Sequence, residues 1–463
     1  MMKTIFREYD IRGIYPHELY DKRVQAIGFL LGEHIVNYFK KPDLKVAIGY
    51  DARVHSKQLF EWLAQGFAKA GVEVLNLGLV ATPVAYFTLF EGGKQIAASV
   101  MITGSHNPKE YNGFKITLDK KPFFGDEIYA LGEEVEKILQ AKISTIAMTH
   151  ITEVNYLECY IQYLTQAFKH LQGLQIPLTL DCGNGVAGVG IAPILNRLNI
   201  AYDGLYMNPD GEFPNHHPDP TEEKNLIEIK QKVTQKGGVG FAFDGDGDRI
   251  AVITPKRVLK GDELAIIFAK HIPNPVVVGE VKCSMNMYNE INRIGRAYMY
   301  KTGHSNIKTK IKELNASLGA EVSGHLFFND RYFGYDDAIY AALRVLELMQ
   351  KGVDLDREIE SLPVLYSTDE LKIQTTEESK FSIIATFRER LHHPPSYFPP
   401  FEDVINVDGV RINFEEGWAL IRASNTTPML VTRFESYKQE NLKIYEKAMH
   451  RLLQEINNSS QYS

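Results

Sequence analysis

Short apolar runs, each followed by a helical pattern, recur through most of this sequence and constrain its fold more than any other feature. The predicted strands are residues 46–49, 72–77, 95–102, 178–181, 239–243 and 276–279, and the predicted helices include residues 59–70, 189–198 and 337–349. Strands that alternate with helices are typical of βαβ units with parallel or mixed sheets. The runs fall into three blocks, of which the second begins near residue 150.

The pattern changes after about Leu365. Apolar alternation predicts strands in residues 371–373, 404–414 and 420–434, and helical patterns cover residues 380–391 and 440–456. We therefore expect a small antiparallel sheet with two helices, which is an α+β unit. The proline-rich residues 392–401 lie between a helix and a strand, so they are predicted to form a loop inside this unit.

Local signals indicate where some helices begin. Ser56 is predicted to cap the helix at residues 59–70. Thr82-Pro83 is predicted to open another helix, with Thr82 as the cap and Pro83 in the first turn. Gly303-His304-Ser305 and residues 321–325 are placed in turns.

Composition narrows the class of protein. With 463 residues, 44% of them apolar, the chain has the length of roughly three or four compact units. Its three cysteines lie far apart, which indicates neither a zinc site nor a disulfide framework, and a reducing compartment fits best. A net charge of −7 provides no general basic surface for nucleic acid.

The same reasoning bears on location. Charged residues appear near the N-terminus before an apolar segment can develop, and no apolar run approaches the ~20 residues that span a bilayer. We therefore expect a cytoplasmic protein that has neither nucleic acid nor a membrane as a partner.

Three aspartates alternate with glycine directly after the predicted strand at residues 239–243. The glycines allow the backbone to curl, so that Asp244, Asp246 and Asp248 can converge on one cation. Oxygen ligands suit Mg²⁺. An EF-hand would need glycine at Arg249 and glutamate at Pro255. The other alternative is a solvated acidic turn, although three close carboxylates repel one another unless they are neutralised.

Ser105 lies in the loop Thr103-Gly104-Ser105-His106-Asn107-Pro108, after a predicted buried strand. The loop is not a G-x-S-x-G elbow, so a serine hydrolase is disfavoured. Read alone, the loop is equally well a turn with a helix-capping serine. A nearby Mg²⁺ would stabilise a phosphoserine, and this combination favours Ser105 as a phosphoryl carrier.

Two further segments have polar groups suited to a phosphorylated sugar. The turn at residues 422–428 offers one guanidinium, three hydroxyls, an amide and backbone N–H groups, which together suit a phosphate, although it is also readable as a polar hairpin turn. Glu321, Ser323 and His325 lie in a glycine-containing turn and could bind sugar hydroxyls. In isolation that turn is readable as a surface loop.

Two other enzyme classes deserve comparison. Residues 183–188 match G-x-G-x-x-G and Asp203 follows about twenty residues later, but a lone fingerprint is equally a tight turn between a strand and a helix. Asp244 begins a D-x-D sequence like that of haloacid-dehalogenase-type phosphatases, yet Gly247 stands where that class has threonine. A non-enzymatic sugar-phosphate sensor is a third alternative.

Taken in order, these motifs resemble the α-D-phosphohexomutase superfamily, and most closely its bacterial phosphomannomutase/phosphoglucomutase branch. The resemblance extends from Phe6-Arg7-Glu8-Tyr9-Asp10-Ile11-Arg12-Gly13 to residues 422–428, nearly the whole chain. It implies three similar mixed-sheet α/β domains and a C-terminal α+β domain around a central cleft. The implied domains are residues 1–149 (phosphoserine), 150–254 (metal), 255–365 (sugar) and 366–463 (phosphate).

The resemblance also implies roles for individual residues. Ser105 matches the phosphoserine, and its phosphate joins Asp244, Asp246 and Asp248 as a metal ligand. The implied substrate contacts are Glu321, Val322, Ser323, Gly324 and His325 for the sugar, Arg422, Ser424, Asn425 and Thr426 for phosphate, and Tyr9, Arg12, Lys115, Lys282 and His304 in the cleft. Arg249 is expected to offset transition-state charge, whereas general acid/base catalysis is open between Arg12, Lys115 and His325.

The implied reaction is the reversible interconversion of hexose 1-phosphate and hexose 6-phosphate. Mg²⁺ is the implied cofactor and a hexose 1,6-bisphosphate the implied intermediate and activator. The sequence Glu321-Val322-Ser323-Gly324-His325 resembles loops associated with mannose and glucose phosphates, and residues 215–220 agree with this. The balance between the two sugars stays open.

Overall fold

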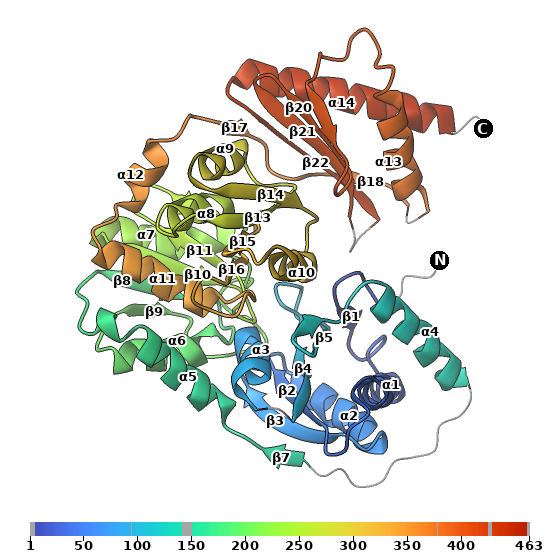
Figure 1. The fold of residues 1–463 in the computed structure, drawn as a ribbon, viewed down its shortest axis with the longest axis vertical. Coiled ribbons are helices and arrows are strands. Elements are labelled where there is room, and N and C mark those ends of the chain that lie inside the picture. Colours follow the sequence, from blue (N-terminus) through green and yellow to red (C-terminus); the bar gives the residue numbers. More distant parts are fainter. Residues whose placement is uncertain (1–4, 94, 141–150, 377, 425–427, 461–463) are drawn as a thin grey trace.

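The computed structural model describes residues 5–93, 95–140, 151–376, 378–424 and 428–460, and its strands form four sheets that follow one another along the chain (Figure 1). The first three sheets mix parallel and antiparallel pairs, and the fourth is antiparallel throughout its described pairs. The predicted fold class, three mixed α/β units followed by an α+β unit, is confirmed.

The first sheet has the strand order β1-β5-β4-β2-β3-β7, with β6 on β5. Its unit comprises β1 (Ile11–Ile14), α1 (Asp21–Phe39), β2 (Lys45–Tyr50), α2 (Ser56–Lys69), β3 (Glu73–Leu79), α3 (Thr82–Glu91), β4 (Ile96–Ile102), β5 (Tyr111–Leu118), β6 (Lys121–Pro122), α4 (Asp126–Gln140) and β7 (Ile151–Glu153). Val100 and Ile102 of β4 face one core and Met101 faces another. Burial on both faces explains why this strand is apolar at every position except Ser99.

The second sheet has the order β12-β11-β10-β8-β9. Its unit comprises α5 (Tyr156–Ala167), η1 (Lys169–Leu171), β8 (Leu178–Asp181), α6 (Ala187–Arg197), β9 (Asp203–Leu205), η2 (Glu223–Leu226), α7 (Ile227–Lys236), β10 (Val239–Phe243), β11 (Ile250–Ile253) and β12 (Val258–Leu259). The parallel strands β8 and β10 lie side by side, so the turns after both strands meet at one edge of the sheet.

The third sheet has the order β14-β13-β15-β16. Its unit comprises α8 (Gly261–Ala269), β13 (Val276–Glu280), α9 (Met285–Ile294), β14 (Arg296–Tyr300), α10 (His304–Leu314), β15 (Leu318–Ala320), β16 (Leu326–Phe328), α11 (Ala338–Gln350) and α12 (Leu355–Glu360). One contiguous core contains Val84 of α3, Ile191 of α6 and Leu343 of α11. This shared core joins the three α/β units into one body.

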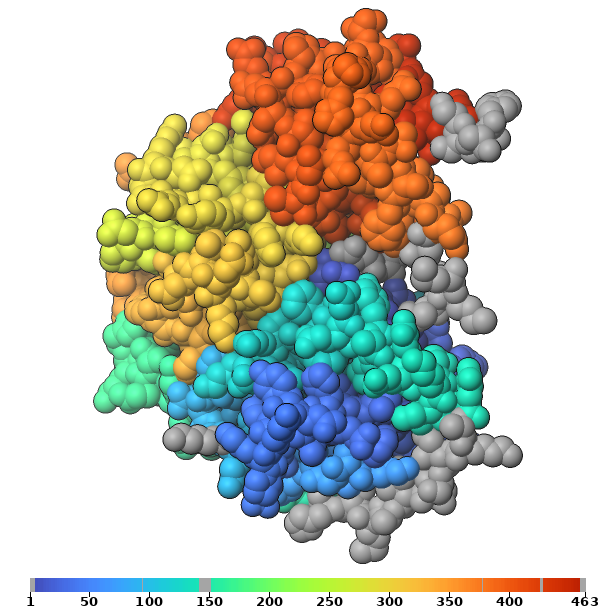
Figure 2. Space-filling model, turned by 45° about the vertical axis from the view of Figure 1, so that its right-hand side comes forward, coloured from blue at the N-terminus to red at the C-terminus, as the bar shows by residue number. Residues whose placement is uncertain are grey.

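The C-terminal unit has its own core. It comprises β17 (Tyr366–Ser367), β18 (Leu371–Gln374), α13 (Ser379–Arg390), β19 (Asp403–Ile405), β20 (Val410–Phe414), β21 (Gly417–Ala423), β22 (Met429–Ser436) and α14 (Gln439–Ser460). The proline-rich residues 392–401 form the predicted loop between α13 and β19. In Figure 2 this unit rests on the third unit and a recess separates it from the first.

Three local predictions are wrong, and two of them share a cause. Ser56 and Thr82 are the first residues of α2 and α3, and the capping positions are occupied by His55 and Ala81. The Ser56 hydroxyl donates to Asp51 (2.6 Å) and the Thr82 hydroxyl donates to Asp246 (2.5 Å). Both hydroxyls thus donate to buried carboxylates, and hydrogen bonds to a charged acceptor are stronger than those between neutral groups.

The third error concerns His304. The sequence placed residues 303–305 in a turn, whereas His304 and Ser305 form the start of α10. Gly303, the residue before this helix, has φ 114°, a conformation that glycine adopts easily. The chain can therefore turn at Gly303 and begin the helix at His304.

A buried carboxyl group ties the second unit to the third. Asp337 accepts hydrogen bonds from the Tyr160 hydroxyl (3.0 and 2.9 Å), the Tyr332 hydroxyl (2.9 Å) and the Tyr340 amide (2.8 Å). Burial raises the pKa of Asp337 to about 7. The three donors offset the desolvation of this group.

We expect Tyr160→Phe to lower the free energy of unfolding by about 1–3 kcal/mol, because a buried acceptor loses one of its donors. Urea titration followed by fluorescence measures this. Tyr163→Phe is the matched control, since Tyr163 lies in the same helix and its ring also contacts Phe87, at 5.4 Å compared with 5.6 Å for Tyr160. Equal losses in the two variants would contradict the role assigned to Asp337.

Candidate active site

The candidate site forms where the ends of strands from different sheets meet. Ser105 follows β4 of the first sheet, and Asp244 follows β10 of the second. Although 139 residues separate them, the Ser105 hydroxyl donates to Asp244 Oδ2 at 3.1 Å. The carboxyl ends of parallel strands are the usual place for ligands in open α/β sheets.

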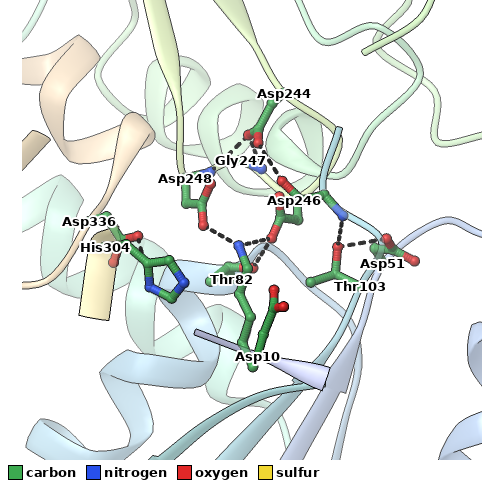
Figure 3. A network of polar contacts seen from close by, with 12 residues as sticks. Asp10, Asp51, Thr82, Thr103, Asp244, Asp246, Gly247, Asp248, His304 and Asp336 are labelled. Atoms are coloured by element: carbon green, nitrogen blue, oxygen red, sulfur yellow. Dashed lines mark hydrogen bonds and ion pairs between the residues drawn. The ribbon is translucent and has the colours of Figure 1, made fainter. Parts of the chain in front are cut away.

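The aspartate turn is compact and buried. Asp244, Asp246 and Asp248 are each 0% exposed. Asp244 Oδ1 accepts from the amides of Gly247, Asp248 and Arg249 at 3.0–3.1 Å, as Figure 3 shows in part. Gly247 has φ 75°, so the chain curls at this glycine as the sequence indicated.

Gly245 is needed for a different reason from Gly247, because its backbone lies against the Ser105 loop. A Cβ atom at this position would lie 2.6 Å from the carbonyl oxygen of Ser105. Glycine therefore allows the aspartate turn to approach the serine loop closely.

Lys115 supplies the nearest positive charge. Its ammonium group donates to Asp246 Oδ2 (2.7 Å) and also pairs with Asp248. Burial opposes ionisation of Asp246, but the charge and hydrogen bond of Lys115, the hydrogen bond of Thr82 and the charge of Arg12 together outweigh it and lower the pKa of Asp246. Burial and the two neighbouring carboxylates raise the pKa of Asp244 well above its ordinary value. One ammonium group therefore does not neutralise three carboxylates.

The donor set of the turn fits a divalent cation. Among the described side chains, Asp246 Oδ1 and Asp248 Oδ1 are buried without a hydrogen-bond partner. Ligand atoms of all three aspartates lie within 4.8 Å of one another. Buried carboxylate oxygens without donors are costly unless a cation binds them, and hard oxygen ligands suit Mg²⁺.

Ser105 adopts a left-handed backbone conformation, with φ 49°. Its hydroxyl lies 3.1 Å from His106 Nδ1 as well as from Asp244. The sequence did not predict this contact, because adjacent residues in an extended chain point apart. Burial, together with Arg249 and Arg12, lowers the pKa of His106 well below its ordinary value, so the imidazole is neutral.

Tyr9 and Arg12, near the N-terminus, also lie at the candidate site. Arg12 donates to the carbonyl of Thr103 (2.9 Å) and pairs with Asp10. The Tyr9 hydroxyl donates to the carbonyl of Thr302 (2.6 Å) in the third unit. Of the predicted cleft residues, Arg12 therefore lies beside the serine loop and Tyr9 lies beside the third unit.

His325 is held at both ring nitrogens. Its Nδ1 lies 3.0 Å from Asp336 Oδ2, and its Nε2 accepts from Arg249 Nε at 2.6 Å. Asp336 also accepts from Lys308 (2.9 Å) and lies 3.9 Å from His304 Nδ1. Figure 3 shows His304 beside Asp336, and burial lowers the pKa of His304 well below its ordinary value.

Sequence reasoning missed Asp336 and Lys308. Asp336 precedes a helix within an Asp-Asp pair, a signal that ordinarily indicates capping, and Lys308 lies inside a helix. Only the packing of α10 against the His325 turn brings them to the site.

The predicted sugar-binding turn lies between β15 and β16. Glu321 accepts from the Gly303 amide (2.6 Å), and the amide of Val322 donates to Glu280 (2.9 Å). Gly324 has φ 94°, and a Cβ atom there would lie 2.3 Å from the Ile250 carbonyl oxygen. Val322 and Ser323 are half-buried, so they are the accessible part of the turn.

The predicted phosphate-binding residues lie where the C-terminal unit meets the third. Arg422 donates to Asp408 (3.0 Å), which also accepts from the Thr302 amide (3.1 Å). Lys282 pairs with Glu370 (2.6 Å). Asn425 and Thr426 lie outside the described residues. The sequence did not single out Asp408 or Glu370.

The carbonyl of Ser424 accepts from Lys380 (2.7 Å), a contact that sequence reasoning also missed. Lys380 is buried and lies in α13, so this bond joins the helix to the end of β21.

The G-x-G-x-x-G segment has a structural explanation. A Cβ atom on Gly185 would lie 2.7 Å from the Gly245 carbonyl oxygen, and one on Gly188 would lie 2.7 Å from the Met207 carbonyl oxygen. Asp203, which a dinucleotide site would need, pairs with Lys232 and Lys236. The glycines allow close packing around the aspartate turn without invoking a dinucleotide.

Within the described part of the chain, every helix is too short or too polar to span a bilayer.

Comparison with family models covers all four units. The phosphoglucomutase/phosphomannomutase models for α/β/α domains I, II and III match residues 3–142, 158–257 and 260–366. The model for the C-terminal domain of the same family matches residues 370–452. The resemblance that the motifs indicated is thereby confirmed.

Individual relatives agree over the whole chain. The phosphomannomutase/phosphoglucomutase of Pseudomonas aeruginosa is 37% identical over 466 residues, which cover 98% of this chain and 96% of that protein. A phosphoglucomutase of Neisseria meningitidis is 35% identical over 447 residues, 94% of each chain. A crystal structure of a phosphoglucomutase/phosphomannomutase family protein from Burkholderia thailandensis is 32% identical, with a TM-score of 0.87 over 98% of this chain and 97% of that one. With its four domains matched and its full length shared, this chain belongs to the phosphoglucomutase/phosphomannomutase family of enzymes.

Proposed function

We propose that this enzyme interconverts hexose 1-phosphates and hexose 6-phosphates, with Ser105 as the phosphoryl carrier and a hexose 1,6-bisphosphate as the intermediate. The observation that carries the proposal is the 3.1 Å contact between the Ser105 hydroxyl and Asp244, within a turn of three fully buried carboxylates. The names of the family relatives support the substrate class.

The proposed metal ligands are Asp244, Asp246, Asp248 and the phosphate of Ser105. Two buried aspartate oxygens without donors support a cation at this turn. A bound Mg²⁺ would supply charge neutralisation for the transferring phosphoryl group.

The remaining charges around Ser105 come from the chain itself. Arg12, which donates to Thr103 of the serine loop, and Lys115 and Arg249 beside the aspartates would offset charge on the transferring group. We assign proton exchange with the substrate hydroxyl to His325. Asp336 orients the imidazole by its contact with Nδ1. The proton acceptor would then be Nε2, which accepts from Arg249 in this structure.

Substrate recognition is divided between two ends of the cleft. We propose that residues 321–325 bind the sugar hydroxyls, with Tyr9, Lys282 and His304 beside them. Arg422, Ser424, Asn425 and Thr426 would bind the phosphate that is not reacting. The bisphosphate would then turn over between transfers, so that each phosphate meets Ser105 once. Mannose and glucose phosphates are the proposed substrates.

The proposed division of the chain follows these roles. Residues 1–149 would supply the phosphoserine, 150–254 the metal ligands, 255–365 the sugar contacts and 366–463 the phosphate contacts. A cytoplasmic location completes the proposal, since hexose phosphates and a reducing environment are both found there.

We expect Ser105→Ala to lower the turnover of mannose 1-phosphate by roughly a thousandfold or more, because the covalent carrier is lost. The assay contains Mg²⁺ and glucose 1,6-bisphosphate. Ser361→Ala, at an exposed serine, is the control and should keep full activity. Phosphopeptide mapping should find an acid-stable phosphate on Ser105. A base-labile phosphate on Asp244, or full activity of Ser105→Ala, would instead favour a phosphatase-like mechanism.

Removal of metal should abolish turnover, and Mg²⁺ should restore it. Asp246→Asn is expected to weaken Mg²⁺ binding by about tenfold or more, because one charged ligand is lost. Calorimetric titration of the metal-free protein with Mg²⁺ measures the affinity. Asp203→Asn, which changes an aspartate on the surface of the second unit, should leave the affinity unchanged. Equal affinities for Asp246→Asn and the parent protein would refute the metal assignment.

The two proposed sugars can be compared directly. Mannose and glucose differ only in the orientation of one hydroxyl, so we expect kcat/KM for their 1-phosphates to agree within about tenfold. A paired kinetic assay measures this ratio. A preference above about a hundredfold would contradict dual specificity and point to a contact that selects one orientation.

A further inference from the structure

Arg53 binds the serine loop through the backbone of that loop. It follows β2 and is 2% exposed. Its Nη2 donates to the carbonyls of Ser105 (2.8 Å) and Asn107 (2.6 Å), and its Nη1 donates to those of Pro108 (2.6 Å) and Tyr111 (3.0 Å). One planar guanidinium thus holds four carbonyl groups of a single loop.

Asp51, which lies in the same connection between β2 and α2 as Arg53, binds both Arg53 and the serine loop. Its Oδ2 lies 3.3 Å from Arg53 Nε and accepts from the Thr103 hydroxyl (2.8 Å) and the Gly104 amide (3.2 Å). Figure 3 shows Thr103 pointing at Asp51. The carboxylate balances the buried guanidinium charge while it holds the start of the loop.

The second unit covers the same arginine. The ring of Phe213 lies 5.2 Å from the guanidinium, and a Cβ atom on Gly211 would lie 2.7 Å from Arg53 Cα. These contacts keep water from competing for the loop carbonyls.

The loop needs such support because it is strained. Ser105 has φ 49°, a conformation that costs a residue other than glycine about 1–2 kcal/mol. Next to it, a Cβ atom on Gly104 would lie 2.3 Å from the Arg53 guanidinium carbon. Gly104 is therefore required by the position of Arg53 and not by its own backbone angles.

We propose that Arg53 is a positioning residue for the phosphoryl carrier: by holding four carbonyls it keeps Ser105 in the left-handed conformation that directs the hydroxyl toward Asp244. The inference rests on the proposed role of Ser105. Lysine at this position keeps the charge opposite Asp51 but has no planar fork, so it leaves some of these buried carbonyls without a donor.

The first test is Arg53→Lys, with Arg344→Lys as the control. Arg344 is also buried and bonded, to Asp330 at 2.9 and 3.0 Å, but lies in α11. We expect kcat for mannose 1-phosphate to fall about a hundredfold in Arg53→Lys with KM changed by less than about threefold, and neither to change in the control.

A second readout separates positioning from loss of folded protein. With Ser105 phosphorylated beforehand, the rate of phosphoryl transfer to glucose 1-phosphate is compared with the rate of loss to water. Misfolding lowers both rates in proportion, whereas a misplaced serine should lower their ratio by about tenfold. A kcat and a ratio both within about twofold of the parent values would overturn the proposal.

Two further measurements cover the remaining outcomes. Gly104→Ala keeps Arg53 but its methyl group would displace the guanidinium, so it should lower kcat even if Arg53→Lys does not fold. An unchanged kcat would count against the proposal.

A crystal structure of either variant reports φ of Ser105 independently of activity, and a retained value near 49° would overturn the proposal. If the parent protein is inactive, only the proposed function is contradicted. The role of Arg53 can still be tested, because φ of Ser105 in the variant structures does not depend on activity.

Discussion

The repulsion between three buried carboxylates organises the centre of this protein. Asp244, Asp246 and Asp248 come from one short turn and have no access to water. Lys115 from the first sheet and the backbone amides of the turn offset part of this charge. A bound cation would offset the rest. Lys115 reaches the turn only because the first and second units pack together.

The serine loop faces this charge under strain. A left-handed serine would relax in isolation, but Arg53, Asp51 and Thr103 hold the backbone on one side while Asp244 receives the hydroxyl on the other. The chemistry and the strain therefore share one loop. Strained residues commonly occur at functional sites, where the surrounding structure determines the conformation.

The third and C-terminal units extend the same network toward a substrate. Asp336 connects His325 with Lys308 from α10, and Asp408 connects Arg422 of the C-terminal unit with Thr302 of the third. His325 and Arg422 thus each have an acidic partner from another segment. A phosphate bound at Arg422, as we propose, would compete with Asp408 and would thereby couple binding to the contact between these units.

Local patterns in the sequence determined most of the elements, the resemblance to a family, and the motifs with the Asp244 turn and the Ser105 loop. Strand β10 begins and ends where its apolar run does, because burial on both faces leaves no polar position in it. Only the tertiary structure decided that Ser56 and Thr82 bond to carboxylates instead of helix ends, that His106 meets Ser105, and that Asp336, Asp408 and Arg53 belong to the site. Periodicity depends on neighbours along the chain, whereas the contacts of Thr82, Asp336 and Asp408 join segments that meet only after the chain has folded.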